Sequence, residues 1–481
     1  MTEIAIASST PYLDIMSAAH RSVLPARFSV SLCLLILLFA VLWIAGGASR
    51  ADVLGQAIAR GAAWFALIAA VAFGRRPAMR RFAAPASILG LIVLLPLLQL
   101  IPLPVVAWQM LPGRDLLTEA AAASGQTQPW RPWSMVPDAT ANALGSLVVP
   151  AAVLLLLAGL RERERAFIPA IMLAVVVAGT AVGLLQATGA GFGNGLINGT
   201  SGDVSGPFAN RNHFALFVAI GCVIVPAWAF QGGRRSGWRG PVALALMPFF
   251  VLTLLATGSR AGLAVGALAV ILALLLAHKG LSRELRRAPR WVLPTSMSCV
   301  LAMLALLIGI SITADRAQSI NRLIMIDAAQ DTRLRSLPTV LAMVKDYFPA
   351  GTGFGSFDPM FRVNEPYHLL KPTYFNHAHN EFLEIVLDGG FAGLVVLLVA
   401  LGWWCVASVR ALRSPLPGAL PGRTGAAVLL LVLIASVFDY PARTPLIMGV
   451  MVMAAAWLTK GWSSEPSSGG SHALPDAGQH L

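Results

Sequence analysis

Three polar clusters interrupt an otherwise apolar sequence, and each contains histidine or arginine beside an apolar run. The clusters are GPFANRNHF at 206–214, TGSRAG at 257–262 and FNHAHNEFLEIVLDGGFAG at 375–393. Histidine can accept a proton at neutral pH because its unperturbed pKa is about 6.5. Arginine holds phosphate well because its planar guanidinium can bind two oxygens at once. Together these side chains could deprotonate a hydroxyl group beside a phosphate.

The arginines in the first two clusters also have a structural explanation. Arg211 and Arg260 could extend toward phospholipid headgroups at the end of a membrane span. Arg260 is the stronger functional candidate, because Gly258, Ser259 and Gly262 around it indicate close backbone packing about its guanidinium.

Two other motifs suggest ligand binding but have simpler explanations. His377 and His379 form an HxH pair that could ligate a metal, yet no third ligand follows at a spacing such as HExxH. GTGFGS at 351–356 resembles a phosphate loop, but no GK[ST] follows it. We therefore predict no metal site and interpret the glycine-rich segment as a flexible turn.

Three acidic residues follow His379 at roughly helical spacing, namely Glu381, Glu384 and Asp388. They could compete as a base or bind the hydroxyl groups of a substrate. They also fit the first turns of a helix, where the helix dipole favours negative charge. Arg443, within a DYPAR segment near the C-terminus, has a possible role that the sequence does not support further.

The chain that carries these clusters is strongly hydrophobic. Its 481 residues are 57% hydrophobic and 12% charged, with a mean hydropathy of +0.73, whereas soluble domains carry about 25% charged residues. The formal charge of +13 could suggest a nucleic-acid partner, but the arginines lie in short runs between apolar segments. This pattern is typical of membrane topology, so we expect membrane lipids as partners and no nucleic acid.

The apolar runs predict an all-α polytopic membrane protein with about twelve transmembrane helices. Spans one to nine occupy 28–312, and spans ten to twelve occupy 382–459. The predicted spans lie near 28–47, 55–73, 83–106, 140–160, 167–187, 211–230, 241–257, 261–277, 292–312, 382–406, 425–438 and 446–459.

Basic loops between the spans predict the orientation of the chain. They place the N-terminal residues 1–27 and a disordered tail at 460–481 in the cytoplasm. Residues 313–381 then form one long periplasmic loop. This topology puts all three polar clusters on the periplasmic side, so Arg211 and His379 should face the same solution.

The long loop contains a predicted amphipathic helix at 334–348, LRSLPTVLAMVKDYF. Its apolar residues at helical spacing are Leu334, Leu337, Leu341 and Val344. Such a segment could lie on the membrane surface or cap the helical bundle. A second outer segment at 107–139 contains Trp108, Trp130 and Trp133, for which anchoring at the membrane interface is favoured over sugar stacking.

The clusters in their order resemble the O-antigen ligase and polymerase superfamily of membrane glycosyltransferases. The segments that carry the resemblance are NRNHFA, TGSRAG, PAGTGFGSF and HAHNEFLEIVLDGGFAG, within about 180–455. The family signature is His, then Asn, Ser or Gln, nine residues, Gly, two residues, and Gly or a similar residue. Here His379-Asn380, Gly390 and Gly393 complete it.

The resemblance implies a GT-C-like fold in the bacterial inner membrane. It also implies transfer of an undecaprenyl-diphosphate-linked glycan to a sugar hydroxyl at the periplasmic face, with inversion and without a metal or cofactor. By resemblance, His379 serves as the base or orients the acceptor, while Arg211, Arg260 and, more weakly, Arg333 bind the diphosphate. The residues expected to support them are Asn210, Asn212, His213, His377, Asn380 and Glu381. Many relatives carry Pro where Arg211 stands, which leaves open whether Arg211 or a neighbour binds.

The acceptor stays open among lipid A core, a growing O-antigen or exopolysaccharide chain, and protein. The alternative from another class is a transporter or flippase of lipid-linked polysaccharide precursors. Carriers of that kind show internal repeats or charged residues within their spans. The predicted spans here are nearly free of charge and show no repeat, which favours an enzyme that acts at the membrane surface.

Overall fold

The computed structural model describes residues 28–189, 193–199, 202–231, 235–286, 328–370 and 375–459, with isolated positions between 289 and 302. Within these residues, eight helical segments are long and apolar enough to cross a membrane. They are α3 (Leu54–Phe73), η1 with α4 (Met79–Phe82 and Ala83–Gln99), α7 with α8 (Pro137–Ser146 and Val148–Ala158), α9 with α10 (Glu162–Arg165 and Ile168–Ala187), α11 (Arg211–Ala229), α12 (Arg239–Ala256), α13 (Arg260–Leu285) and α18 (Glu381–Arg413). Three shorter apolar helices are α2 (Val30–Ala45), α19 (Leu420–Ala435) and α20 (Pro445–Leu458).

Eleven of the predicted spans overlap these helices, although the C-terminal ends of α4, α13 and α18 differ from the predicted ends by seven or eight residues. The predicted span at 292–312 lies outside the described residues except for isolated positions, as do the predicted cytoplasmic segments 1–27 and 460–481. Among the described residues, the regular secondary structure is helical except for one short antiparallel pair, β1 (Pro102–Leu103) with β2 (Arg131–Pro132), in which Pro102 faces Pro132.

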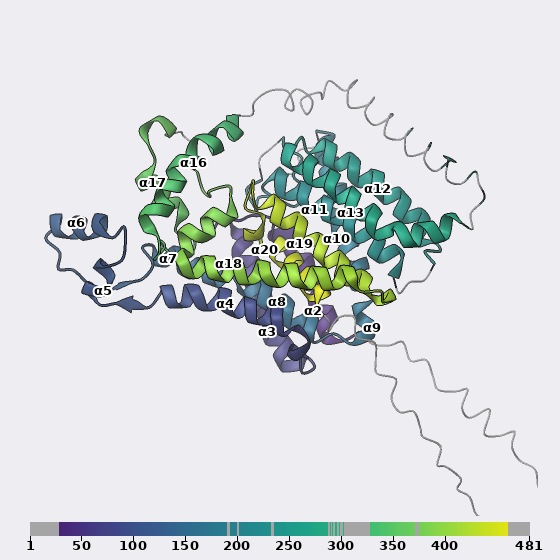
Figure 1. Ribbon diagram of the computed structural model, residues 1–481, viewed down its shortest axis with the longest axis horizontal. Coiled ribbons are helices and arrows are strands. Elements are labelled where there is room, and N and C mark those ends of the chain that lie inside the picture. Colours follow the sequence, from purple (N-terminus) through teal and green to yellow (C-terminus); the bar gives the residue numbers. More distant parts are fainter. Residues whose placement is uncertain are drawn as a thin grey trace, which may run out of the picture.

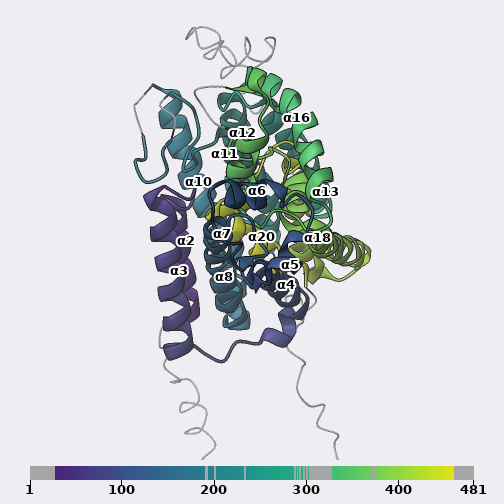
Figure 2. The ribbon, with the colours of Figure 1, turned by 90° about the vertical axis from the view of Figure 1, so that its left-hand side faces the viewer.

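Helix α11 forms the centre of the bundle. Of its most apolar stretch, 94% is buried, and it packs against α10, α12, α13 and α19. A helix that is apolar all round belongs in a core, and α11 is buried without a break from His213 to Ala229. Most of the other spans bury only one side and present Leu, Ile, Val and Phe outward. Helices α2 and α3 lie side by side along one edge of the molecule (Figure 2).

The two outer segments of the sequence form one lobe at the left end of the molecule in Figure 1. The first contributes α5 (Val105–Gln109) and α6 (Asp115–Ala123), and the second contributes α16 (Ala328–Tyr347), α17 (Phe357–Asn364) and η3 (Tyr367–Leu369). Arg114 joins the two, because its guanidinium donates to the carbonyls of Trp133 and Gly351 at 2.9 and 3.0 Å. The predicted long loop is largely helical over its described residues, because α16, α17 and η3 make up most of them.

The predicted amphipathic helix is confirmed as α16, but of the predicted stripe only Val344 packs inward with Val340 and Met343. Val340 and Met343 are each 1% exposed against a cluster that includes Phe357 and Phe361. Leu334 and Leu341 are 67% and 48% exposed. The helix thus caps the bundle with one face and leaves the leucine face outward.

The predicted interfacial role is wrong for Trp108 in the outer segment. Trp108 is 2% exposed and donates from Nε1 to the Pro132 carbonyl at 2.9 Å. Trp133 donates to the Ala350 carbonyl at 3.0 Å. Because both indole nitrogens bind backbone within the lobe, these side chains hold the lobe together. Trp130 is 64% exposed, as an interfacial residue would be.

The glycine-rich segment that the sequence suggested was a flexible turn is packed against a break in α18. Thr352 and Gly353 donate their backbone N–H groups to the carbonyls of Leu387 and Asp388 at 3.0 and 2.9 Å. The Leu387 and Asp388 carbonyls can accept these hydrogen bonds because α18 is not helical at Gly390, where φ is 58°. A Cβ at Gly390 would lie 2.1 Å from the Pro349 carbonyl oxygen, so the signature glycine is required by close approach and by positive φ.

Gln99, at the end of α4, fixes the same junction from the other side. Its amide donates to the Asp388 carbonyl at 2.9 Å and accepts from the Phe354 N–H at 3.0 Å. Helices α4 and α18 lie side by side here (Figure 1). Gln99 thereby joins the glycine-rich segment to α18 at Asp388.

Candidate functional site

A helix begins within each of the three polar clusters, directly after a residue whose side chain caps its N-terminal end. The Asn210 side chain accepts from the Asn212 N–H and starts α11, and Ser259 accepts from the Gly262 N–H and starts α13. Asn380 accepts from the Leu383 N–H and starts α18. These caps satisfy backbone donors that a helix start leaves open. Arg211 and Arg260 are consequently the first residues of their helices.

The caps of α11 and α13 meet at one aspartate that the sequence did not single out. Asp439 lies in the turn between α19 and α20 and is 3% exposed. Its Oδ2 accepts from the side-chain amides of Asn210 and Asn212 at 3.1 and 2.6 Å. Asn212 in turn accepts from the Ser259 hydroxyl at 2.7 Å, which links α13 to the same point.

Two histidines approach the other oxygen of Asp439. His213 Nε2 lies 3.5 Å from Oδ1, and His379 Nδ1 lies 3.4 Å from it. Within the described residues, His379 Nδ1 has no well-aligned hydrogen bond. Burial lowers the pKa of His379 below its ordinary 6.5, and the Asp439 carboxylate opposes that effect only in part. Although burial alone would raise the pKa of Asp439, the contacts with His213 and His379 hold it well below its usual range.

Of the predicted phosphate-binding arginines, Arg333 contacts this aspartate directly, whereas Arg211 and Arg260 start the helices whose caps are linked to it. Arg333, on α16, lies 3.6 Å from Asp439 Oδ2 and donates to the Phe438 carbonyl at 3.1 Å. Arg211 lies 3.8 Å from Asp203, and Arg260 follows Ser259 in the first turn of α13. We call the set of Asn210, Arg211, Asn212, His213, Ser259, Arg260, Arg333, His379 and Asp439 the Asp439 cluster.

Tyr440 separates the two histidines of the HxH pair. Its ring contacts His379 with centroids 4.9 Å apart and His377 with centroids 4.2 Å apart. His377 then pairs with a different carboxylate, because its Nδ1 lies 2.8 Å from Glu384 Oε1. The two imidazoles therefore take separate acidic partners, Asp439 and Glu384, rather than joining at one ion.

The three acidic residues of α18 surround Arg443. Its Nη2 lies 3.1 Å from Glu384 and 3.9 Å from Asp388, and its Nε lies 3.9 Å from Glu381. From the sequence, these acids were interpreted either as a base or hydroxyl-binding groups, or as residues favoured by the helix dipole. The structure adds a charge partner from the η5 turn (Pro441–Arg443), which no spacing within 375–393 could reveal.

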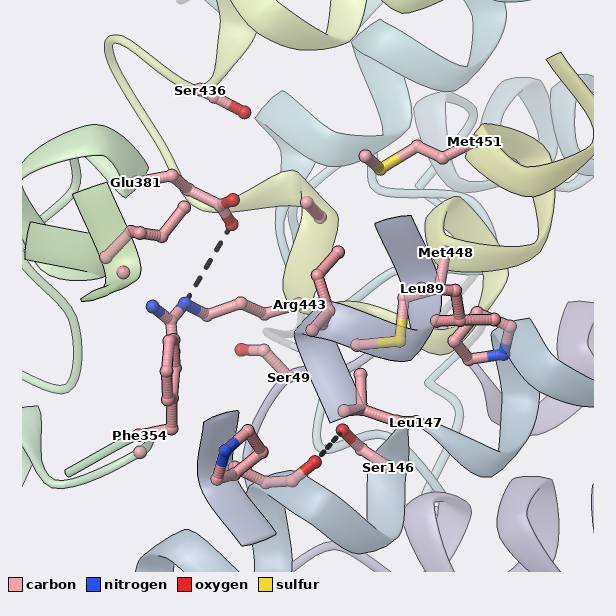
Figure 3. Close-up of a pocket in the computed structure, with 18 of the residues that line it drawn as sticks. Ser49, Leu89, Ser146, Leu147, Phe354, Glu381, Ser436, Arg443, Met448 and Met451 are labelled. Carbon is pink, nitrogen blue, oxygen red and sulfur yellow. Dashed lines mark hydrogen bonds and ion pairs between the residues drawn. The ribbon is translucent and has the colours of Figure 1, made fainter. Parts of the chain in front are cut away.

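A cavity of about 950 Å³ lies beside Arg443 (Figure 3). Of the predicted site residues, only His377 and Glu381 line it; those in the Asp439 cluster do not. In Figure 3 Glu381 and Arg443 face the cavity as a pair, and Leu89, Met448 and Met451 line it from α4 and α20. The structure thus contains two neighbouring polar regions, one on each side of Tyr440.

Comparison with known protein families gives one match. Residues 242–398 match the family described as O-antigen ligase, a segment that contains Arg260, Arg333 and His379. A search of curated proteins found no match. The family match confirms the predicted resemblance for TGSRAG, PAGTGFGSF and HAHNEFLEIVLDGGFAG, whereas NRNHFA lies outside the matched residues. With the apolar helices, it indicates a multi-pass membrane protein.

Proposed function

We propose that this chain is a membrane glycosyltransferase, because residues 242–398 match the family described as O-antigen ligase. It transfers an undecaprenyl-diphosphate-linked glycan to a sugar hydroxyl at the periplasmic face of the bacterial inner membrane. The acceptor is lipid A core in a ligase, or the next lipid-linked unit of an O-antigen or exopolysaccharide in a polymerase.

The observation that carries the proposal is the convergence of cationic helix starts and a histidine on Asp439. The N-terminal ends of α11 and α13, each with an arginine as first residue, are joined through Asn212 to Asp439. A helix N-terminus attracts anions through its free N–H groups and its dipole. With Arg333 beside them, Arg211 and Arg260 would hold a diphosphate within reach of His379.

In the proposed reaction the acceptor oxygen attacks the anomeric carbon of the donor. The carbon–oxygen bond to the diphosphate breaks as the new glycosidic bond forms, and its electron pair leaves with the lipid diphosphate. His379 takes the proton of the acceptor hydroxyl or orients that hydroxyl. Arginines positioned before the reaction stabilise the charge that develops on the leaving group. Attack from the opposite face inverts the anomeric configuration.

The environment of His379 suits a base. Burial lowers its pKa, so the imidazole is uncharged and able to accept a proton at neutral pH. Asp439 contacts the Nδ1 side of the ring at 3.4 Å, which leaves Nε2 for the substrate. A carboxylate that orients a histidine base in this way also stabilises the imidazolium formed when the proton arrives.

A transfer assay with purified protein, lipid-diphosphate-linked oligosaccharide and acceptor tests the proposal. We expect His379→Ala to abolish transfer while membrane insertion and protein abundance stay normal. The matched control is His278→Ala, because His278 is exposed near the C-terminal end of α13, far along the helix from Arg260. Full activity of His379→Ala would remove the proposed base.

A further inference from the structure

Arg60 lies inside a membrane helix, on the wall of the cavity beside Arg443. It stands in the second turn of α3, about 9 Å along the helix axis from its start. Charged side chains within membrane spans are costly, so they pair with an opposite charge or mark the path of a ligand or ion. The spans of this chain are nearly free of charge, and Arg60 is an exception that calls for an explanation.

The contacts of Arg60 hold its guanidinium in place without neutralising it. Nη1 donates to the Asn142 side chain at 2.7 Å, and Nη2 donates to the Gln56 side chain at 3.4 Å. Gln56 is itself fixed, because it is 3% exposed and its amide donates to the Ala48 carbonyl at 2.6 Å. Both acceptors are neutral, and no carboxylate pairs with Arg60 among the described residues. The side chain therefore brings an uncompensated positive charge to the cavity.

Part of this guanidinium is also unused as a donor. Arg60 Nε is buried and has no hydrogen-bond partner among the described residues. A buried donor without an acceptor is costly unless a ligand supplies one. The planar guanidinium can bind two phosphate oxygens at once. A phosphate in the cavity would supply both the missing acceptor and the missing negative charge.

Most of the other charged side chains on the cavity wall already have a partner of opposite charge. These pairs are Arg50 with Asp52, Asp358 with Arg362, and Arg443 with Glu381 and Glu384. Asp138 lies in the first turn of α7, where the helix dipole favours a carboxylate. Arg60 is consequently the arginine of this wall that can best receive an anion.

The rest of the cavity is apolar and lies between membrane helices. Its volume is about 950 Å³. The apolar wall includes Ile92 of α4, Val396 and Leu397 of α18, Leu433 of α19, and Met451 and Val452 of α20 (Figure 3). Such a wall accommodates a hydrocarbon chain favourably. The cavity therefore suits an amphiphile whose head group carries phosphate.

We infer that this cavity binds the lipid-linked acceptor, with a phosphate of the acceptor at Arg60 and its hydrocarbon chain between α4, α18 and α20. The inference rests on the proposed function, in which both forms of acceptor, lipid A core and a lipid-linked polysaccharide unit, are phosphorylated lipids. His377 and Glu381 line the same cavity, so the acceptor sugar lies on the His377 side of Tyr440. The donor diphosphate lies at the Asp439 cluster, whose residues do not line the cavity.

Photolabelling of the full-length protein in phosphatidylcholine nanodiscs tests the anion site. The probe is dodecyl phosphate with a photoreactive group near the end of its alkyl chain, and dodecyl glucoside with the same group is the uncharged comparison. We expect the phosphate probe to label α4, α18 or α20 at the cavity in preference to the glucoside. Equal labelling by the two probes, or phosphate labelling only at other positions, would overturn the inference.

Substitution of Arg60 tests the charge itself. Arg60→Gln should weaken phosphate labelling by about tenfold to hundredfold, because a charged hydrogen bond is lost, and should leave glucoside labelling unchanged. Arg60→Lys keeps the charge and should lose less. The matched control is Arg75→Gln, which should change neither, since Arg75 is exposed just beyond the other end of α3. Equal loss of both probes in Arg60→Gln would contradict the charge argument, and if that variant fails to unfold at a normal temperature, Arg60→Lys and the two probes on the parent chain decide.

Transfer kinetics test whether the ligand is the acceptor. Arg60→Gln should raise KM for the acceptor by about tenfold or more and leave KM for the donor within about twofold. A rise in the donor KM instead would place the donor in the cavity and overturn the assignment. Displacement of the phosphate probe by phosphatidylglycerol as readily as by lipid-linked acceptor would indicate a site for bulk phospholipid and overturn it as well.

The two proposals can fail separately. If the phosphate probe does not label the cavity while His379→Ala still abolishes transfer, this inference fails and the proposed function stands. If the probe binds through Arg60 but the parent chain transfers no glycan, the proposed function fails, and the acceptor assignment fails with it.

Discussion

Asp439→Asn is the substitution that tests the organisation of the site most sharply, because both carboxylate oxygens already accept hydrogen bonds. Oδ2 accepts from the amides of Asn210 and Asn212, and Oδ1 accepts from the Tyr440 N–H at 3.0 Å. Asparagine has one acceptor oxygen and one NH₂ group. Whichever way the new amide turns, its NH₂ faces a donor that Asp439 now satisfies.

The magnitude follows from those contacts. A buried donor left without an acceptor costs about 1–3 kcal/mol, and Arg333 loses the charge that lies 3.6 Å from it. We estimate a total of about 2–4 kcal/mol. If misalignment of His379 raises the activation free energy by this amount, the rate falls roughly 30- to 900-fold, at about 1.36 kcal/mol for each factor of ten.

The assay is the initial rate of glycan transfer at saturating donor, with Asp115→Asn as the matched control. Asp115 is exposed at the start of α6, so its substitution should leave the rate within about twofold of the parent chain. The amounts of inserted protein and the unfolding temperatures are measured in parallel. A well-folded Asp439→Asn variant that transfers within about threefold of the parent rate would refute the role assigned to Asp439.

Three other predictions concern the same region. Gly390→Ala should destabilise the protein by about 3 kcal/mol or more, since its Cβ would meet the Pro349 carbonyl oxygen at 2.1 Å; an unchanged unfolding temperature would contradict the described break in α18. Gln99→Leu should lower the unfolding temperature, because the Phe354 N–H loses its acceptor, whereas an increase would show that this hydrogen bond is dispensable. The pKa of His379 lies below 6.5, so the acid limb of the rate–pH profile should also lie below pH 6.5; a limb at higher pH would exclude His379 as the titrating base.

Hydropathy predicted the helical bundle well, because a helix that crosses a membrane requires a long run of apolar residues. The predicted span at 211–230 also begins where α11 begins, and the structure shows that Asn210 caps this helix. The short helices of the outer lobe were harder to predict. In α16 the leucines at helical spacing are exposed, while Val340 and Met343 pack inward, because the packing face depends on a neighbour, Phe357, that periodicity does not identify.

The sequence singled out several residues of the candidate site but not Asp439, the residue that they share as a neighbour. His379, Arg260 and Arg333 were identified by residue type, predicted side and resemblance. Asp439 was not, because a single aspartate in a turn between two apolar runs looks like an ordinary surface residue. Its function as a shared acceptor depends on contacts across 229 residues of sequence with Asn210. Arg443 was named with a possible role, but its acidic partners were not predicted because they lie on a different helix.

The most direct test of the account is the fate of the lipid diphosphate in a reconstituted system. Purified protein in sealed vesicles is given a labelled lipid-diphosphate-linked oligosaccharide and an acceptor, without ATP. We predict that one lipid diphosphate is released for each new glycosidic bond, and that His379→Ala releases none. Movement of intact lipid-linked oligosaccharide across the membrane, with no diphosphate released, would contradict glycosyl transfer and indicate a carrier.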